Sequence, residues 1–211
     1  MPLKYYSNAR EGVKNIRSAW LVSIWLMVVT GLMALCGLAR LAGFVLVLAL
    51  ATLGLSIAGF VLELMGVNRA ARDVEIFSSA RTALIVGIVL SLICAFLPEG
   101  SVLRRLLELV GSVCSLIVAV CIIKGLIALA RIYRRDDLIA AGQKLLRLVV
   151  ILFIINTATD LLILLFFADD SNLLLPLLGT LIGLVLGIIR YVMTLRYLSS
   201  VLDMLSAPVP Q

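Results

Sequence analysis

The chain contains no histidine and few charged residues. Only 14% of its 211 residues are charged, against roughly 25% in an ordinary soluble domain. A soluble domain needs polar side chains to cover its core, and this sequence has too few of them. The lack of histidine also removes the base or ligand on which serine-dependent and metal-dependent sites usually rely. We therefore expect a membrane protein that has neither a metal site nor histidine-dependent catalysis.

Cysteine is also sparse. The chain has four cysteines, none of them in a C-x-x-C pair, and all four fall inside long apolar runs. Without histidine partners they do not match the spacing of a metal or redox site. We interpret Cys36, Cys94, Cys114 and Cys121 as apolar residues of membrane helices and expect no cofactor.

Long apolar runs are what the sequence does have. Hydrophobic residues make up 63% of the chain, and the mean hydropathy is +1.20. A helix crosses a bilayer with about 20 such residues, and the runs are solidly apolar instead of alternating as in a membrane β-barrel. The sequence predicts an all-α, polytopic bundle of six transmembrane helices in three hairpins. The expected spans are approximately 19–39, 41–65, 82–97, 107–130, 148–168 and 173–194.

The domain organisation follows from these spans. Residues 1–18 are expected to form a cytoplasmic amphipathic lead-in, residues 19–200 the six-helix transmembrane domain, and residues 201–211 a short cytoplasmic tail. Turn-forming residues such as Gly, Pro, Asp, Asn and Ser occupy the connections of the hairpins.

The distribution of basic residues predicts the orientation in the membrane. Thirteen of the 18 Lys and Arg residues fall in the N-terminal segment, the second and fourth connections and the stretch after the sixth span, whereas three fall in the other connections. By the positive-inside rule, both termini are cytoplasmic in the cell membrane. We interpret the net charge of +6 as orientation and attraction to anionic lipids on the cytoplasmic face. Nucleic acid is not an expected partner.

The three hairpins begin with similar segments. SNAREGVKNIRSA, DVEIFSSARTA and DDLIAAGQKLLR share a polar start, small residues and a later basic residue. Either the hairpins are true internal repeats, or their common topology produces the likeness. True repeats would predict pseudo-symmetric packing.

The opening KYYSNAREGVKNI, followed by three hairpins with basic flanking segments, resembles a group of uncharacterised small six-helix membrane proteins of anaerobic bacteria. The resemblance implies the six-helix topology. It implies no activity, because none is assigned to that group.

Small residues at helical spacing predict close helix contacts. Gly179, Gly183 and Gly187 form two overlapping G-x-x-x-G steps, and Gly111 and Ser115 share the same spacing in the fourth span. In lipid, close backbone approach over small residues replaces the hydrophobic drive between helices. These stripes pack either the helices of one chain or those of a homo-oligomer or a partner membrane protein.

Three charged residues lie near the cytoplasmic ends of the returning helices: Glu63, Lys124 and Arg190. The long basic side chains can extend their charges to the lipid headgroups while their stems stay in the apolar layer. Glu63 is too short to do so and is expected to pair with a basic neighbour. The alternative to anchoring at the inner leaflet is that these charges line a polar vestibule.

Asp160 lies in the middle of the fifth span. Asn156 and Thr157 precede it by four and three residues, so the three side chains share one helix face. A charged carboxylate exposed to lipid is costly, so this face is expected to point into the bundle or a water pocket. It forms either a satisfied structural group or an intramembrane polar site for an ion or a proton.

Two functional classes remain open, and an enzyme is not expected. An intramembrane aspartyl protease needs two carboxylates sharing a catalytic water. Asp160 is the only carboxylate expected in the middle of a membrane span. The first class is a small ion or solute permeation protein, or a membrane subunit of a transporter. The second is a structural or assembly subunit that binds partner helices and anionic lipid. We favour the first class.

Overall fold

The computed structural model describes residues 6–38, 42–98, 101–166 and 174–207, which form six α-helices. Each helix contains a stretch long and apolar enough to cross a membrane. The predicted all-α bundle of six membrane helices is confirmed. The helices are α1 (Ser7–Leu38), α2 (Ala42–Ala70), α3 (Ile76–Ala95), α4 (Val102–Ile132), α5 (Asp136–Phe166) and α6 (Leu174–Leu205).

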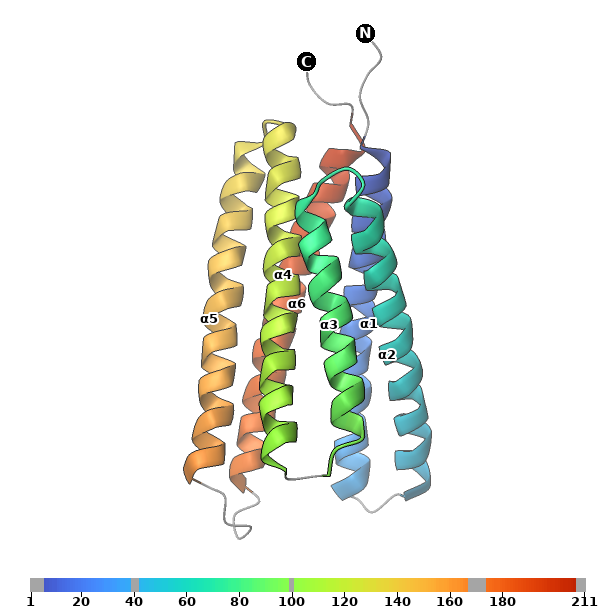
Figure 1. Ribbon diagram of the computed structural model, residues 1–211, viewed down its shortest axis with the longest axis vertical. Helices are drawn as coiled ribbons and strands as arrows, with labels where there is room; N and C mark the ends of the chain where they lie inside the picture. The colour runs from blue at the N-terminus through green and yellow to red at the C-terminus, as the bar shows by residue number, and fades with distance from the viewer. Residues whose placement is uncertain (1–5, 39–41, 99–100, 167–173, 208–211) are drawn as a thin grey trace.

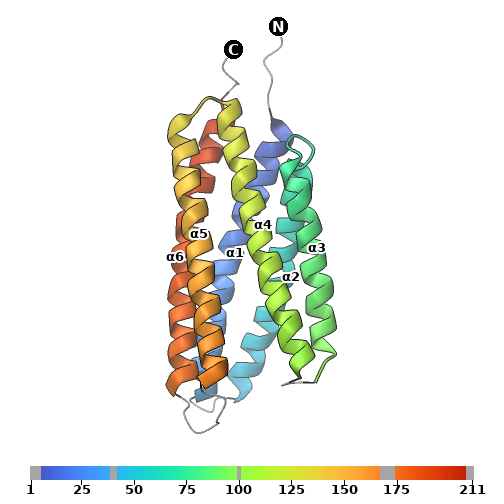
Figure 2. The same ribbon diagram turned by 60° about the vertical axis from the view of Figure 1, so that its left-hand side comes forward.

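The helices close into a ring. Each helix packs against the next along the chain, α1 packs against α6, and α4 also contacts α6 across the interior. Figure 1 shows that both ends of the chain lie at one end of the bundle, which we call the terminal end. The α2–α3 and α4–α5 connections lie there too, as Figures 1 and 2 show. The most basic segments therefore share one end, as their charges predict.

The helices extend beyond the predicted spans, chiefly at the terminal end. α1 begins at Ser7 and α5 at Asp136, well before the expected span boundaries, and α6 continues to Leu205. A hydropathy criterion ends a span where charged residues begin. Nothing in these polar segments breaks a helix, however, so the expected lead-in 1–18 is largely the first part of α1.

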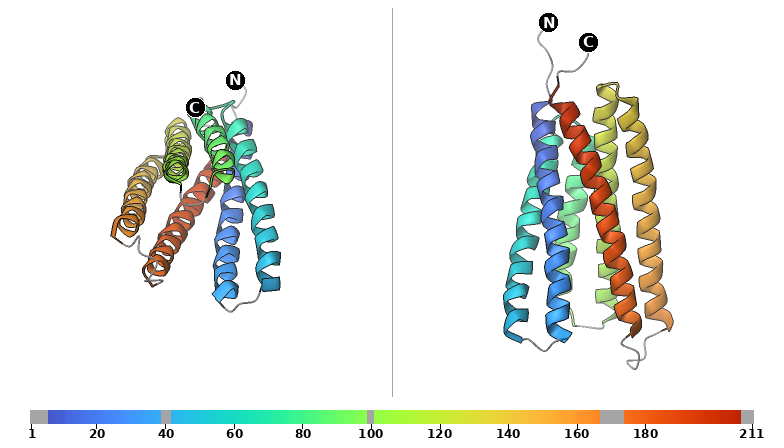
Figure 3. Two further views of the ribbon diagram at one scale, coloured as in Figure 1. Left: turned by 60° about the horizontal axis from the view of Figure 1, so that its bottom comes forward. Right: turned by 180° about the vertical axis from the view of Figure 1, so that it is seen from behind.

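The hydrophobic core lies in the terminal half of the bundle. Its buried residues come from the first turns of α1, α3 and α5 and the last turns of α2, α4 and α6. The largest fully buried side chains there include Ile16, Val67, Phe77, Leu126, Val149 and Leu198. Toward the opposite end the α1–α2 hairpin diverges from the α5–α6 hairpin (Figures 1 and 3). The bundle is thus tightly closed at the terminal end.

Glycine allows close contact inside every hairpin near the terminal end. In the first, a Cβ added to Gly66 would lie 2.7 Å from the Gly12 carbonyl oxygen, so the α1 and α2 backbones touch. Gly125 of α4 accommodates the ring of Phe77 from α3, and Gly142 of α5 accommodates Tyr197 of α6. The glycine lies on both helices of the first hairpin, on the second helix of the next and on the first helix of the last, so the repetition of hairpins stays a hypothesis.

Polar contacts further fix the terminal end. Asp73, in the α2–α3 connection, accepts hydrogen bonds from the Ala9 backbone N–H at 2.8 Å and from the Asn8 side chain at 3.1 Å. It therefore caps the N-terminus of α1, whose first N–H groups have no partner within the helix. Arg69 and Glu11 form an ion pair of 2.6 Å between α2 and α1. These bonds hold the α2–α3 connection and the end of α2 to the start of α1.

Candidate functional site

A cavity of about 750 Å³ with both polar and apolar walls lies between α3 and α4 on one side and α1, α2 and α6 on the other. It begins beside the hydrophobic core and extends along α3 and α4 to their turn at the opposite end of the bundle. Its lining includes two acidic residues, two arginines and four serines. A cavity of this size falls in the range typical of small-molecule sites.

Two residues of opposite charge line the deep end of the cavity. Glu63 from α2 and Arg190 from α6 both line it, and they attract each other through space. Among the described residues they form no direct ion pair. The Nε atom of Arg190 is buried and has no hydrogen-bond partner within the described part of the chain. An isolated charge inside a membrane is costly, so this arrangement points to a polar environment.

Two aromatic side chains, Trp20 and Tyr191, contact the charged residues at the deep end of the cavity. The indole N–H of Trp20, from α1, donates a hydrogen bond to a carboxylate oxygen of Glu63 at 3.1 Å. The Trp20 ring also packs edge-on against Tyr191 of α6, with centroids 5.4 Å apart. The Arg190 guanidinium lies 5.0 Å from the Tyr191 ring centroid, within the distance of a cation–π contact. Trp20 thus links the helices that present the two charges.

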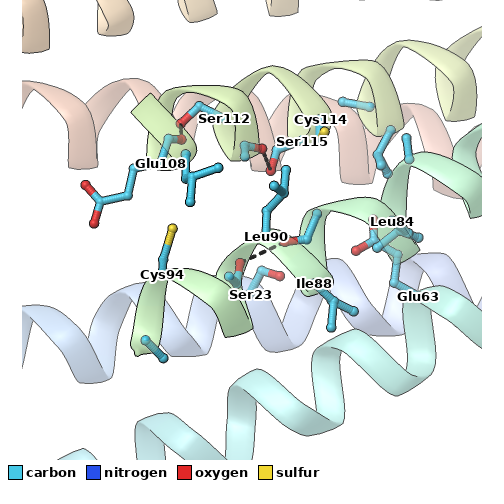
Figure 4. Close-up of a pocket in the computed structure, with 18 of the residues that line it drawn as sticks. Ser23, Glu63, Leu84, Ile88, Leu90, Cys94, Glu108, Ser112, Cys114 and Ser115 are labelled. Carbon is cyan, nitrogen blue, oxygen red and sulfur yellow. Dashed lines mark hydrogen bonds between the residues drawn. The ribbon is translucent and has the colours of Figure 1, made fainter. Parts of the chain in front are cut away.

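Serine hydroxyls and a second ion pair line the rest of the cavity. Ser112 and Ser115 bond the carbonyls of Glu108 and Gly111, one turn earlier on α4. Their donor hydrogens are therefore used within the helix, while each oxygen can still accept a bond. Figure 4 shows Glu108 toward one end of the cavity and Glu63 toward the other. Near the opposite end of the bundle, Arg104 and Glu108 pair at 2.9 Å.

Arg190 also lines a second, smaller pocket of about 200 Å³. This pocket lies between α1, α5 and α6 and includes Asn156, Gly183 and Gly187. Arg190 therefore stands between the large cavity and the polar stripe predicted on α5.

The three predicted inner charges separate in the structure. Glu63 and Arg190 both line the cavity, whereas the Lys124 side chain is exposed on the surface of α4. The vestibule hypothesis therefore fits Glu63 and Arg190, and anchoring at the leaflet fits Lys124. Glu63 accepts a hydrogen bond from Trp20, and its expected pairing with a basic neighbour stays a prediction.

The predicted polar stripe on α5 is described only in part. Asn156 and Thr157 are half-buried, and Asn156 faces Gly183 of α6, where an added Cβ would lie 3.1 Å from its side-chain oxygen. Asp160 belongs to helix α5, but its side chain lies outside the described residues. The expected site at Asp160 stays a prediction.

The small residues expected to pack helices have different surroundings. A Cβ added to Gly187 would lie 2.6 Å from the end of Met27 on α1, and Gly183 faces Asn156. Near Gly111 no described atom lies within 4 Å of such a Cβ, because Gly111 and Ser115 form part of the cavity wall. The surroundings of Gly179 lie outside the described residues.

Sequence reasoning did not single out Trp20 and Tyr191. Two features of the sequence could have indicated them: Tyr191 directly follows the charged Arg190 inside an apolar run, and Trp20 stands at the start of the first apolar run. Among the described residues, no three Cys, Asp or Glu side chains gather as metal ligands.

No family model, curated protein or solved structure matches the chain. The chain has six membrane-length helices, and no family is identified. The chain is a multi-pass membrane protein by its six spans, and its activity has to be inferred from the cavity.

Proposed function

We propose that the protein is a small-solute permeation protein, or the solute-binding membrane subunit of a transporter, and that the cavity holds the solute. The observation that supports this most is the convergence of Glu63 and Arg190 on one cavity of about 750 Å³. A helix bundle that needed only stability would gain from apolar packing here, because replacing buried charges by well-packed apolar residues is often neutral or stabilising.

The charges suggest the chemistry of the solute. A guanidinium stays protonated at physiological pH and binds carboxylate or phosphate oxygens with two parallel hydrogen bonds. Glu63 offers an acceptor to an ammonium or hydroxyl group. A small polar solute with an anionic group at Arg190 and a cationic or donor group at Glu63 satisfies both charges, and α-amino acids belong to this class.

The position of the cavity supports a route with one closed end. Its lining reaches the α3–α4 turn at the end opposite the termini, while the buried core fills the terminal half. With cytoplasmic termini, as the basic residues predict, solute enters from outside and the core blocks its passage inward. Release to the cytoplasm then requires the helices to separate at the terminal end, as in alternating access.

Flux in reconstituted vesicles tests this function. The purified chain is tested with α-amino acids, alkali cations, chloride and phosphate, and we expect saturable flux of at least one of them. Losing a hydrogen bond to a charged group costs about 1.5–3 kcal/mol. Arg190→Gln and Glu63→Gln should therefore weaken the apparent affinity roughly tenfold or more.

Lys124→Gln is the matched control, because it removes a charge that is exposed on α4 and lies off the cavity. It should leave flux unchanged. Absence of flux for the whole panel in correctly folded protein would reject permeation by this chain and favour the alternative, a structural subunit. Flux that all three variants preserve would reject the cavity as the route.

A further inference from the structure

A groove between α1 and α6 near the terminal end has both basic and apolar walls. It has a volume of about 480 Å³ and contains Arg17 and Leu21 of α1. From α6 it contains Val192, Leu195, Arg196, Ser199 and Ser200. It is separate from the cavity described above, with which it shares no residue.

Within the described part of the chain, the two arginines of this groove have no partner of opposite charge. At the same end of the bundle, Arg69 pairs with Glu11 and Arg135 pairs with Asp137. Arg17 and Arg196 are exposed and form no ion pair among the described residues. Two like charges beside one groove repel each other, and an anion between them removes this cost.

The charged residues of the groove lie at the depth expected for a phospholipid headgroup, and its apolar residues lie at the depth of the acyl chains. Arg17 is the last basic residue before the apolar run of α1, and Arg196 is the first charged residue beyond Arg190 on α6. Both therefore lie at the expected boundary of the apolar layer. Leu21 lies one turn deeper on α1, and Val192 lies one turn deeper on α6. Both are partly exposed, at 42% each, so they can contact an acyl chain.

We infer that this groove is a binding site for one anionic phospholipid, whose phosphate lies between Arg17 and Arg196 and whose acyl chains lie along Leu21 and Val192. Guanidinium groups bind phosphate oxygens bidentately. The hydroxyl oxygens of Ser199 and Ser200, whose hydrogens bond the carbonyls of Leu195 and Arg196, can accept bonds from headgroup hydroxyls. The basic terminal end attracts anionic lipid generally, whereas this groove selects a single bound molecule.

Native mass spectrometry of the full chain with added lipid tests the site. Phosphatidylglycerol is the anionic probe and phosphatidylcholine of the same acyl chains is the zwitterionic probe. An arginine near an anionic headgroup strengthens binding by roughly fivefold. We expect Arg17→Gln/Arg196→Gln to weaken phosphatidylglycerol binding about 25-fold, to the level of phosphatidylcholine.

The matched control is Arg72→Gln/Arg131→Gln, which removes the same net charge from exposed arginines of the terminal end outside the groove. It should retain preferential binding. Arg17→Lys/Arg196→Lys keeps the charge but loses the bidentate geometry, and should lie between the parent and the glutamine variant.

Three results would overturn the inference. Equal affinity of the parent for the two lipids would show that the groove does not select an anionic headgroup. Equal weakening by the control pair would show a diffuse effect of charge. Displacement of the lipid by millimolar inorganic phosphate would show that the arginines bind free phosphate and that the acyl chains contribute nothing.

Discussion

The contact between Gly12 and Gly66 predicts that one methyl group destabilises the first hairpin. A Cβ on Gly66 would lie 2.7 Å from the Gly12 carbonyl oxygen and 2.8 Å from the Ile16 backbone nitrogen, whereas ordinary contacts begin near 3.4 Å. These two obstacles are backbone atoms of α1, so rotation of the Ile16 side chain, which also lies within 2.8 Å, would not relieve them. The two helices would have to separate locally by about 0.7 Å, the difference between those distances.

We expect Gly66→Ala to lower the free energy of unfolding by about 1–3 kcal/mol, the usual cost of overpacking. Separation of the helices would also stretch the bonds of Asp73 to α1. Gly54→Ala is the control on the same helix, because no described atom outside the adjacent turns of α2 lies within 4 Å of its added Cβ. It should keep or slightly raise stability, since alanine favours helix over glycine by about 1 kcal/mol.

The assay is unfolding of both variants and the parent in one detergent, followed by circular dichroism and by thermal aggregation. If Gly66→Ala and Gly54→Ala were equally stable, the backbones of α1 and α2 would not be in contact at this position, and the packing described for the terminal end would be wrong.

The remaining predictions concern capping, topology and the α5 stripe. Asp73→Ala should lower stability by about 0.5–2 kcal/mol through loss of a helix cap, and an unchanged unfolding midpoint would contradict that role. With native cysteines removed, an impermeant thiol reagent added to intact cells should label Ser171→Cys and not Ser7→Cys; the reverse pattern would invert the topology. Asp160→Asn should preserve thermal stability whether the group is structural or functional. It should abolish flux only if Asp160 binds a cation or a proton, so unchanged flux would leave it a structural group.

The six helices could be predicted from the sequence because their apolar runs are long and clearly separated. Their first and last residues could not be predicted: α1 starts at Ser7 because polar side chains can continue a helix outside the apolar layer. Hydropathy measures transfer into lipid and carries no information about such extensions.

The site was predictable only as a set of candidates. Glu63, Lys124 and Arg190 are alike in sequence as charges in apolar surroundings, yet two line the cavity and Lys124 faces outward. The helices are apolar on all sides, so their hydrophobic pattern does not show which face points inward. Gly12 and Gly66 were missed because their contact joins two helices and follows no spacing within one.

The accessibility of the cavity to water tests the proposed function most directly. Ser112 lines the cavity, whereas the adjacent Val113, 41% exposed, is not among its lining residues and lies on the apolar surface of α4. In a cysteine-free background, we expect a charged, impermeant thiol reagent added outside intact cells to label Ser112→Cys rapidly and Val113→Cys hardly at all. A small polar solute that binds in the cavity should slow the first reaction. Equally slow labelling of both positions would mean that water does not enter the cavity, and would contradict its role as the solute site.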